Sequence, residues 1–355
     1  MKSQIPHPSW IEVDLTQFKR NIEIIKAHIG KTKYCLPVKA NAYGHGLLAI
    51  AEVAQEAGVD YLAVAHLSEG AYLREANIVL PILVLGAIHE EQIEDLIKYD
   101  LELTLSSKFK ADLVAYKAKR LGKTCRVHLE IDTGMQRTGV RPESAESLLR
   151  HVEALGCFEI KGIYSHLATA DTPLDPTAQK QIRSFTILLQ NPLFQSPDRL
   201  FHLANSGATA FYPDSHFDMV RPTLMTLGYP PPGAPGALAA IEPCFSVKSK
   251  VSYFKVVGQG SGISYGHKHT TEKQTRIVTV PVGYGDGYNR SLSNLGSVLI
   301  RGQHFPIVGS ICMDQFMVDV GCSEVYVGDE VVLLGRQNNH QITACELAEK
   351  CGTIT

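Results

Sequence analysis

Reactive polar residues follow several short apolar runs in the first two thirds of the chain. They are Lys39, the segment 132–137, His166, the pair Asn205 and Ser206, and Arg221. A lysine amine can condense with a carbonyl carbon, and it can also accept a proton. A guanidinium such as that of Arg221 donates hydrogen bonds and has no proton to spare. These side chains would form one catalytic site if the apolar runs were strands of a single sheet.

The apolar runs alternate with helical patterns along this part of the chain. Eight candidate strands cover residues 33–39, 61–65, 81–85, 101–105, 125–131, 159–165, 199–204 and 217–220. Helical patterns occupy 47–57, 69–76, 91–99, 109–121, 143–155 and 177–190, and Ser68 is expected to cap the second of them. Eight strand–helix units predict a parallel (β/α)8 TIM-like barrel, with the chemistry at the carboxyl ends of the strands. An open doubly wound sheet stays as the alternative.

The pattern changes after residue 229. Proline and glycine dominate residues 230–236, and short alternating runs rich in Val, Ile, Tyr and Gly begin at Phe245. These features predict a linker followed by a mostly-β domain. The α/β barrel is therefore assigned to residues 1–235 and the β domain to residues 236–355. A further strand is expected at 9–13, so residues 1–13 could pack with the β domain.

Composition argues against several classes of protein. The 34 basic and 36 acidic residues nearly balance, so no basic field is available for nucleic acid or an anionic membrane. The longest apolar stretch, 78–88, contains Pro81 and is too short to span a bilayer. The eight scattered cysteines form no Cys-x-x-Cys pair, and no secretory leader is seen, so a cytoplasmic protein is expected. His267 and His269 lack a carboxylate cluster, and no metal site is expected.

The run 38–46, Val-Lys-Ala-Asn-Ala-Tyr-Gly-His-Gly, resembles the cofactor-lysine signature of the alanine racemase family. Further blocks with the family's order and spacing lie at 132–137, 164–168, 205–206, 219–222, 264–267, 283–288 and 309–315. These blocks span almost the whole chain. On the strength of them, the chain is identified as a member of that family. The resemblance implies a pyridoxal 5'-phosphate enzyme that interconverts L- and D-alanine and supplies D-alanine for peptidoglycan.

The resemblance also implies roles for individual residues. Lys39 would carry the cofactor as an imine and act as the base on one face of the substrate. Tyr265 of the partner subunit would be the base on the opposite face, in a head-to-tail homodimer with shared sites. Arg221 would face the pyridine nitrogen of the cofactor, and His166 would pack beside the ring.

Further residues are assigned to the cofactor phosphate and to the substrate. The phosphate would be held by Tyr43, Asn205, Ser206, Thr223 and Leu224, although the family usually has glycine at the position of Thr223. Three residues would meet the substrate carboxylate, Met313 and Asp314 of the partner subunit and Arg137. Tyr284 is expected to support the site.

Two features depart from the family. Glu130 stands where many members have a carbamylated lysine, and its carboxylate is expected to hold Arg137 directly or through water. The family's sequence continues beyond the position of Thr355 into a tyrosine that narrows the site and a last strand, so the β domain is expected to be truncated. Three alternatives stay open: a broader, serine-type racemase, a non-catalytic pyridoxal-phosphate carrier, and an inactive remnant.

Overall fold

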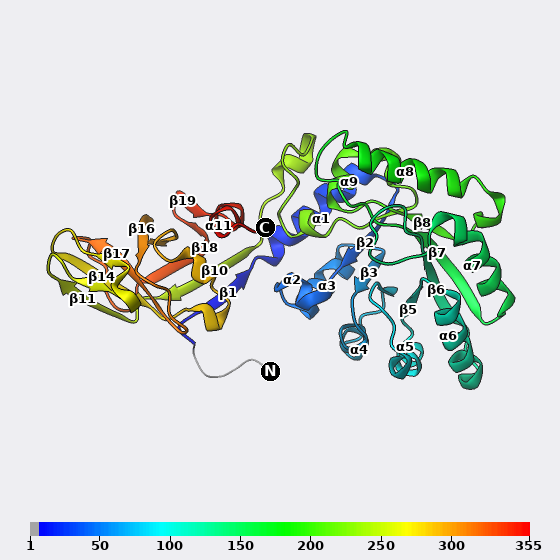
Figure 1. The fold of residues 1–355 in the computed structure, drawn as a ribbon, viewed down its shortest axis with the longest axis horizontal. Helices are drawn as coiled ribbons and strands as arrows, with labels where there is room; N and C mark the ends of the chain where they lie inside the picture. Colours follow the sequence, from blue (N-terminus) through cyan, green and yellow to red (C-terminus); the bar gives the residue numbers. More distant parts are fainter. Residues whose placement is uncertain (1–6) are drawn as a thin grey trace. The chain divides into compact units, whose positions relative to one another are not determined.

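A computed structural model describes residues 7–355 of the protein (Figure 1). The chain folds into two compact units. One comprises residues 15–244, and the other combines residues 245–355 with the N-terminal segment that ends at Asp14. The second unit is therefore built from both ends of the chain.

Eight parallel strands close into a barrel in the unit of residues 15–244. They are β2 (Lys33–Pro37), β3 (Tyr61–Val64), β4 (Ile82–Val84), β5 (Glu102–Leu105), β6 (Cys125–Glu130), β7 (Phe158–Tyr164), β8 (Leu200–His202) and β9 (Met219–Val220). The barrel closes where Lys33 and Tyr34 of β2 pair with Met219 and Val220 of β9. The predicted (β/α)8 barrel is confirmed, and the open-sheet alternative is wrong.

Helices follow the strands and cover the outside of the barrel. The longer ones are α1 (Leu15–Ile29), α3 (Leu47–Glu56), α4 (Leu67–Glu75), α5 (Ile93–Lys98), α6 (Lys108–Leu121), α7 (Pro142–Ala154) and α8 (Pro176–Leu189). Short helical turns are α2 (Lys39–Tyr43), α9 (Ser206–Phe211), α10 (Thr223–Thr226), η1 (Glu90–Gln92), η2 (Pro192–Phe194), η3 (Pro213–Ser215) and η4 (Gly236–Ala240). The helices are held by apolar stripes, as in α1, where Phe18, Ile22, Ile25 and Ile29 are buried at helical spacing.

The other unit contains a nine-stranded antiparallel sheet. Its order is β1 (Trp10–Val13), β10 (Phe245–Lys250), β18 (Glu330–Gln337), β15 (Ser297–Ile300), β16 (Gln303–Val308), β17 (Phe316–Gly321), β14 (Thr275–Val280) and β11 (Tyr253–Val257), and β19 (His340–Ile342) pairs with β18. The pair β12 (Gly262–Ile263) and β13 (His269–Thr270), the turns η5 (Tyr265–His267), η6 (Tyr284–Asp286) and η7 (Arg290–Leu292), and α11 (Ala344–Cys351) complete the unit.

The N-terminal strand β1 belongs to this sheet because Trp10 to Val13 pair with Lys248 to Phe245 of β10. The core of the unit is formed by buried valine, isoleucine and phenylalanine side chains, among them Val280, Ile307 and Phe316. Among the described residues, no helix is both long and apolar enough to cross a membrane.

Candidate active site

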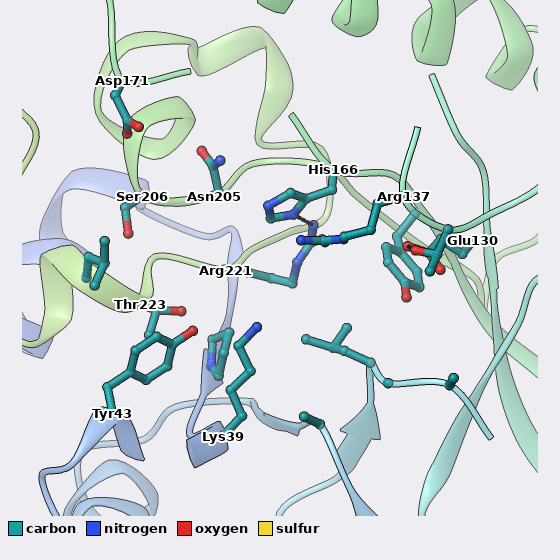
Figure 2. Close-up of a pocket in the computed structure, with 18 residues that line it drawn as sticks. Lys39, Tyr43, Glu130, Arg137, His166, Asp171, Asn205, Ser206, Arg221 and Thr223 are labelled. Atoms are coloured by element: carbon teal, nitrogen blue, oxygen red, sulfur yellow. Dashed lines mark hydrogen bonds between the residues drawn. The ribbon is translucent and has the colours of Figure 1, made fainter. Parts of the chain in front are cut away.

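A cavity of about 480 Å³ opens at the carboxyl ends of the barrel strands, within the usual size range of small-molecule sites (Figure 2). Its lining includes every residue that the sequence analysis assigned to the barrel site: Lys39, Tyr43, Glu130, Arg137, His166, Asn205, Ser206, Arg221, Thr223 and Leu224. These residues come from the ends of β2, β6, β7, β8 and β9 and from the loops that follow them. The barrel thus gathers side chains that are separated by up to about 180 residues in the sequence.

Lys39 is held by an unusual backbone turn. The strand β2 ends at Pro37, and Ala40, Asn41, Ala42 and Tyr43 then all have φ between 52 and 55°, so α2 is a left-handed turn. Each L-residue in this conformation costs roughly 1–2 kcal/mol. The cost must be offset by surrounding contacts, and such strain is concentrated at functional sites.

Side chains from neighbouring elements provide those contacts. The carboxylate of Glu69 accepts a hydrogen bond from Ala40 N at 2.6 Å and one from Ala65 N, after β3, at 2.8 Å. Asn41 Oδ1 accepts from Leu47 N, at the start of α3, at 2.8 Å. The turn is therefore fixed to the helix that follows it, α3, and to the next strand–helix unit, β3 and α4, and the amine of Lys39 points into the cavity (Figure 2).

The environment of Lys39 favours the neutral amine. Burial lowers the pKa of Lys39, the positive charge of Arg137 lowers it further, and the carboxylate of Glu69 opposes the shift. Because only the neutral amine is nucleophilic, this environment prepares Lys39 to bond a carbonyl group.

This shift can be measured on the ligand-free protein. We expect an amine-acylating reagent to modify Lys39 with a midpoint at lower pH than it modifies the surface lysines, because a lowered pKa leaves more neutral amine at a given pH. Arg137→Gln should move the midpoint upward without abolishing the difference, since burial remains. Peptide mass spectrometry across a pH series reads both midpoints. A midpoint for Lys39 equal to that of the surface lysines would contradict the lowered pKa of Lys39.

Arg221 follows β9 directly and is 4% exposed. Its Nη1 donates to His202 Nδ1 at 2.5 Å, and its Nη2 donates to the carbonyls of Ser165 at 2.7 Å and Leu203 at 3.3 Å. The guanidinium also lies over the ring of Tyr164, 5.3 Å from its centroid. Among the described residues, no hydrogen-bond partner is found for Nε, so this N–H is available to a ligand.

His166 lies beside Arg221 in the cavity (Figure 2). Burial lowers the pKa of His166 to about 3, with further lowering by the charges of Arg221, Arg137 and Lys39. The imidazole is therefore neutral, and its Nδ1 can accept a hydrogen bond from Arg221 Nη2 at 3.3 Å. A neutral ring of this kind can pack against an aromatic ligand without adding charge.

Hydroxyl groups line another part of the cavity. Tyr43 and Ser206 lie there with Thr223 between them (Figure 2), and a hydrogen bond to Thr223 partly opposes the rise that burial causes in the pKa of Tyr43. Ser206 Oγ accepts from Met225 N at 3.3 Å, which joins the loops after β8 and β9. Asn205 Oδ1 accepts from Ala208 N at 3.1 Å and caps α9. These hydroxyls and helix starts suit an anion such as a phosphate.

Glu130 and Arg137 line the cavity on the side of Arg221 that is opposite Tyr43 and Ser206 (Figure 2). Glu130 Oε1 accepts a hydrogen bond from Thr138 Oγ1 at 2.7 Å, whereas Arg137 is exposed and acts on Glu130 through its charge. Burial raises the pKa of the Glu130 carboxyl, and the bond from Thr138 and the charges of Arg137 and Arg221 oppose the rise. A permanent cation therefore stands at the open side of the cavity, where it can bind a carboxylate.

The remaining predicted residues lie in the other unit, around an open hollow of their own. Its lining includes Tyr265, Tyr284, Met313 and Asp314. Tyr265 is 75% exposed and Met313 is 62% exposed, so both are available for contact with another molecule.

Backbone contacts fix the loops around this hollow. Ser310 Oγ donates to Tyr265 O at 3.1 Å, and Gly285 N donates to Met313 O at 2.8 Å. A Cβ atom at Gly283 would lie 2.3 Å from the Met313 carbonyl, so only glycine permits this approach.

Comparison with known proteins gives a uniform result. A model of the alanine racemase N-terminal domain matches residues 13–231, and one of the C-terminal domain matches residues 244–355. The alanine racemase of Symbiobacterium thermophilum is 41% identical over 98% of this chain and 93% of its own length. The chain belongs to the alanine racemase family. The predictions of this family and of an enzyme of the alanine racemase class are confirmed.

Solved structures agree with this family. The alanine racemase of Clostridium difficile 630 has a TM-score of 0.92, with 37% identity over 99% of this chain and 92% of that chain. A histidine racemase from Leuconostoc mesenteroides has a TM-score of 0.89, with 30% identity over 98% of this chain and 94% of that chain. The alanine racemase fold is thus shared by proteins named for different amino acids.

The alanine racemase motifs did not draw attention to every residue of the cavity. Tyr164, Thr138 and Asp171 also line it, and none of them was assigned a role from the sequence. Tyr164 is the last residue of β7, two residues before His166, so the rule that strand ends carry the chemistry could have found it. The position of Asp171, in the loop after β7, gave no such signal.

Proposed function

We propose that the protein is a pyridoxal-phosphate-dependent racemase that interconverts L- and D-alanine, with D-alanine used for peptidoglycan. The observation that carries this proposal is the placement of a half-buried amine, Lys39, in one cavity with the buried cation Arg221 and a group of anion-binding hydroxyls. The lowered pKa of Lys39 supports a nucleophilic role for its amine.

The chain's residues fit the cofactor. Lys39 would hold the aldehyde carbon covalently, and the free Nε–H of Arg221 would face the ring nitrogen. Tyr43, Asn205, Ser206 and the backbone at Thr223 and Leu224 would hold the phosphate, as barrel phosphate sites often form from the last two strand–helix loops. When bound, the cofactor withdraws electrons from the substrate and makes the proton on its α-carbon removable.

Arg221 would limit how strongly the bound cofactor withdraws electrons from the substrate. Its guanidinium donates a hydrogen bond but has no proton to give to the ring nitrogen. Burial lowers the pKa of Arg221, yet the nearby carboxylate of Glu130 favours its charged form. We therefore expect the ring nitrogen to stay unprotonated, which limits side reactions of the cofactor.

Inversion of the α-carbon needs a proton acceptor on one face and a donor on the other. Lys39 Nζ would serve one face, and the phenol of Tyr265 from a partner subunit would serve the opposite face. Arg137, with Met313 and Asp314 of the partner subunit, would bind the substrate carboxylate, and Tyr284 would support that loop. The exposure of Tyr265 and Met313 in this chain is in keeping with a homodimer that shares its sites.

Serine, histidine and other amino acids are the alternative substrates. The histidine racemase of this fold makes a broader specificity a real competitor. Assays with each amino acid distinguish an alanine racemase from a racemase of broader specificity, since an alanine racemase should convert alanine fastest.

Covalent capture tests the cofactor assignment. We expect the purified protein to be yellow and to absorb near ~420 nm, because the amine of a lysine forms a reducible bond with the cofactor aldehyde. Reduction with borohydride followed by peptide mass spectrometry should find the cofactor on Lys39, with surface lysines such as Lys108 as internal controls. Recovery of the label mainly on another lysine would remove the proposal.

Glu130 gives a prediction about substrate binding. Its negative charge faces Arg137, so Glu130→Gln should raise KM for alanine more than it changes cofactor binding. Because burial raises the pKa of Glu130, the carboxylate takes up its proton at a higher pH than usual as the solution is acidified. In the wild type, KM should therefore rise on the acid side, and this rise should be absent in Glu130→Gln.

Thr138→Val is the matched control for this experiment. It removes the 2.7 Å hydrogen bond to Glu130 but keeps the charge, so a smaller rise in KM is expected. Steady-state kinetics across pH compare the three proteins. Wild-type kinetics in Glu130→Gln would show that this carboxylate does not act on Arg137.

A further inference from the structure

The interior of the barrel holds three titratable side chains that the proposed reaction does not use. Glu102 on β5 is 1% exposed, and His128 on β6 and His202 on β8 are fully buried. Burial of such groups is costly unless each has a partner. They form an unbroken series of contacts that ends at Arg221.

The series contains three hydrogen bonds. Arg221 Nη1 lies 2.5 Å from His202 Nδ1, His202 Nε2 lies 2.9 Å from His128 Nδ1, and His128 Nε2 lies 2.9 Å from Glu102 Oε2. Arg126 lies beyond, with its Nε 3.7 Å from Glu102 Oε1. The series therefore connects Arg221, in the proposed cofactor site, to the ion pair between Glu102 and Arg126.

Only one arrangement of protons satisfies all three bonds with neutral rings. Arginine can only donate, so His202 must accept through Nδ1 and carry its proton on Nε2. His202 then donates to His128 Nδ1, and His128 donates from Nε2 to Glu102. Burial, with the positive charge of Arg221, lowers the pKa of His202, which keeps its ring neutral.

The surrounding residues hold the rings in place. The ring of Tyr164 stacks on His202 at 4.9 Å, and the ring of Tyr61 meets His128 edge-on at 6.3 Å. A Cβ atom at Gly162 would lie 2.4 Å from His128 Nδ1, so glycine on β7 leaves the space that this imidazole occupies. Both imidazoles are therefore confined to one orientation.

We propose that Glu102, His128 and His202 are positioning residues that act on the cofactor through Arg221. Glu102 fixes the tautomer of His128, which fixes that of His202, so that an acceptor always faces Arg221. The opposite tautomer of His202 would place one N–H against another and push the guanidinium away from the ring nitrogen. This inference rests on the proposed function, because that function gives Arg221 its role.

Nuclear magnetic resonance of the cofactor-free protein tests the tautomers independently of activity. With ¹⁵N-labelled histidine, His128 and His202 should each show a protonated Nε2 and an unprotonated Nδ1. Glu102→Leu removes the terminal acceptor, and a mixture of tautomers is expected in both rings. A protonated Nδ1 on His202 in the wild type would overturn the proposal.

Kinetics and absorption test the effect on the cofactor. In the loaded enzyme, Glu102→Leu should lower kcat by roughly 10- to 100-fold, the scale for residues that orient a functional group, and leave KM for alanine within about twofold. The absorption band of the bound cofactor should shift as well. His216→Gln is the control, because this histidine bonds to Thr209 O and is not a member of the series that ends at Arg221, and it should change neither quantity.

Glu102→Gln covers the case in which Glu102→Leu does not fold. It keeps an acceptor and removes the charge, so a smaller loss of kcat and a partial tautomer mixture are expected. An unchanged kcat and spectrum in the folded variants would show that the series is only structural. An absence of racemisation in the wild type would instead overturn the proposed function, and the resonance experiment would still decide the tautomers.

Discussion

Tyr265→Phe is expected to lower racemisation by ~10²-fold or more, the usual scale for a positioned acid–base group, while the protein keeps its yellow colour. The phenol supplies only the proton transfer on the face opposite Lys39, so cofactor binding should not change. Tyr265 is largely exposed in its own unit, and the substitution should therefore leave the fold intact. Racemisation is followed by chiral chromatography of alanine, and cofactor binding by absorption.

A neighbouring tyrosine provides the control for that experiment. Tyr253, on β11, is 58% exposed and lines the same hollow, so Tyr253→Phe removes an equivalent hydroxyl outside the proposed catalytic pair. It should keep the wild-type rate. Full activity in Tyr265→Phe would mean that another group serves the second face.

Mixing inactive variants then tests the shared site. Lys39→Ala and Tyr265→Phe should recover activity when their subunits exchange, because some mixed dimers have one intact site. No recovery, under conditions where exchange is demonstrated by a tagged subunit, would place Tyr265 in the site of its own subunit.

Lys39→Ala should have the largest effect of any single substitution. It removes the covalent attachment of the cofactor and one proton acceptor together, so both the band near ~420 nm and measurable racemisation should be lost. Lys39→Arg keeps a positive charge but lacks a nucleophilic amine, and it should be equally inactive. The assay is the same chiral measurement with added cofactor.

Structural damage must be separated from chemical loss in these variants. The left-handed turn after Lys39 is held by Glu69 and Asn41, and neither bond involves the lysine side chain. Thermal unfolding of Lys39→Ala without cofactor should therefore match the wild type without cofactor. Substantial racemisation by Lys39→Ala would contradict the role of this amine.

The alternation of strands and helices was sufficient to predict the barrel. All eight predicted strands exist, with ends within a few residues, because buried parallel strands have a short apolar pattern bounded by turns. The rule that chemistry lies at strand ends then selected Lys39, His166 and Arg221, which line one cavity.

Features set by tertiary contacts were harder to predict. The helix α4 begins at Leu67, so Ser68 lies inside it and the predicted cap is wrong. Glu69 accepts from His66 N at 3.1 Å and from Ala65 N within its own turn, and it also accepts from Ala40 N, a contact that exists only once the barrel has formed. The strand predicted to reach Lys39 ends at Pro37 for a related reason, since its continuation is the left-handed turn.

The buried series from Glu102 to His202 was also missed. Each of its residues interrupts an apolar strand with a polar side chain, as Glu102 does between Leu101 and Leu103. A charged residue within a buried strand is a signal that could have been followed. The identity of its partners, however, depends on the closure of the barrel, which places β5, β6 and β8 around one interior.

The central claim is that the protein racemises alanine. It is tested most directly by measuring the proportions of L- and D-alanine after reaction. The purified protein, supplied with pyridoxal phosphate, should convert either L-alanine or D-alanine into an equal mixture of the two. In deuterium oxide, the product should carry deuterium on its α-carbon, and alanine should react faster than serine or histidine. Retention of the starting enantiomer by the folded, cofactor-loaded protein, or faster conversion of another amino acid, would contradict the account.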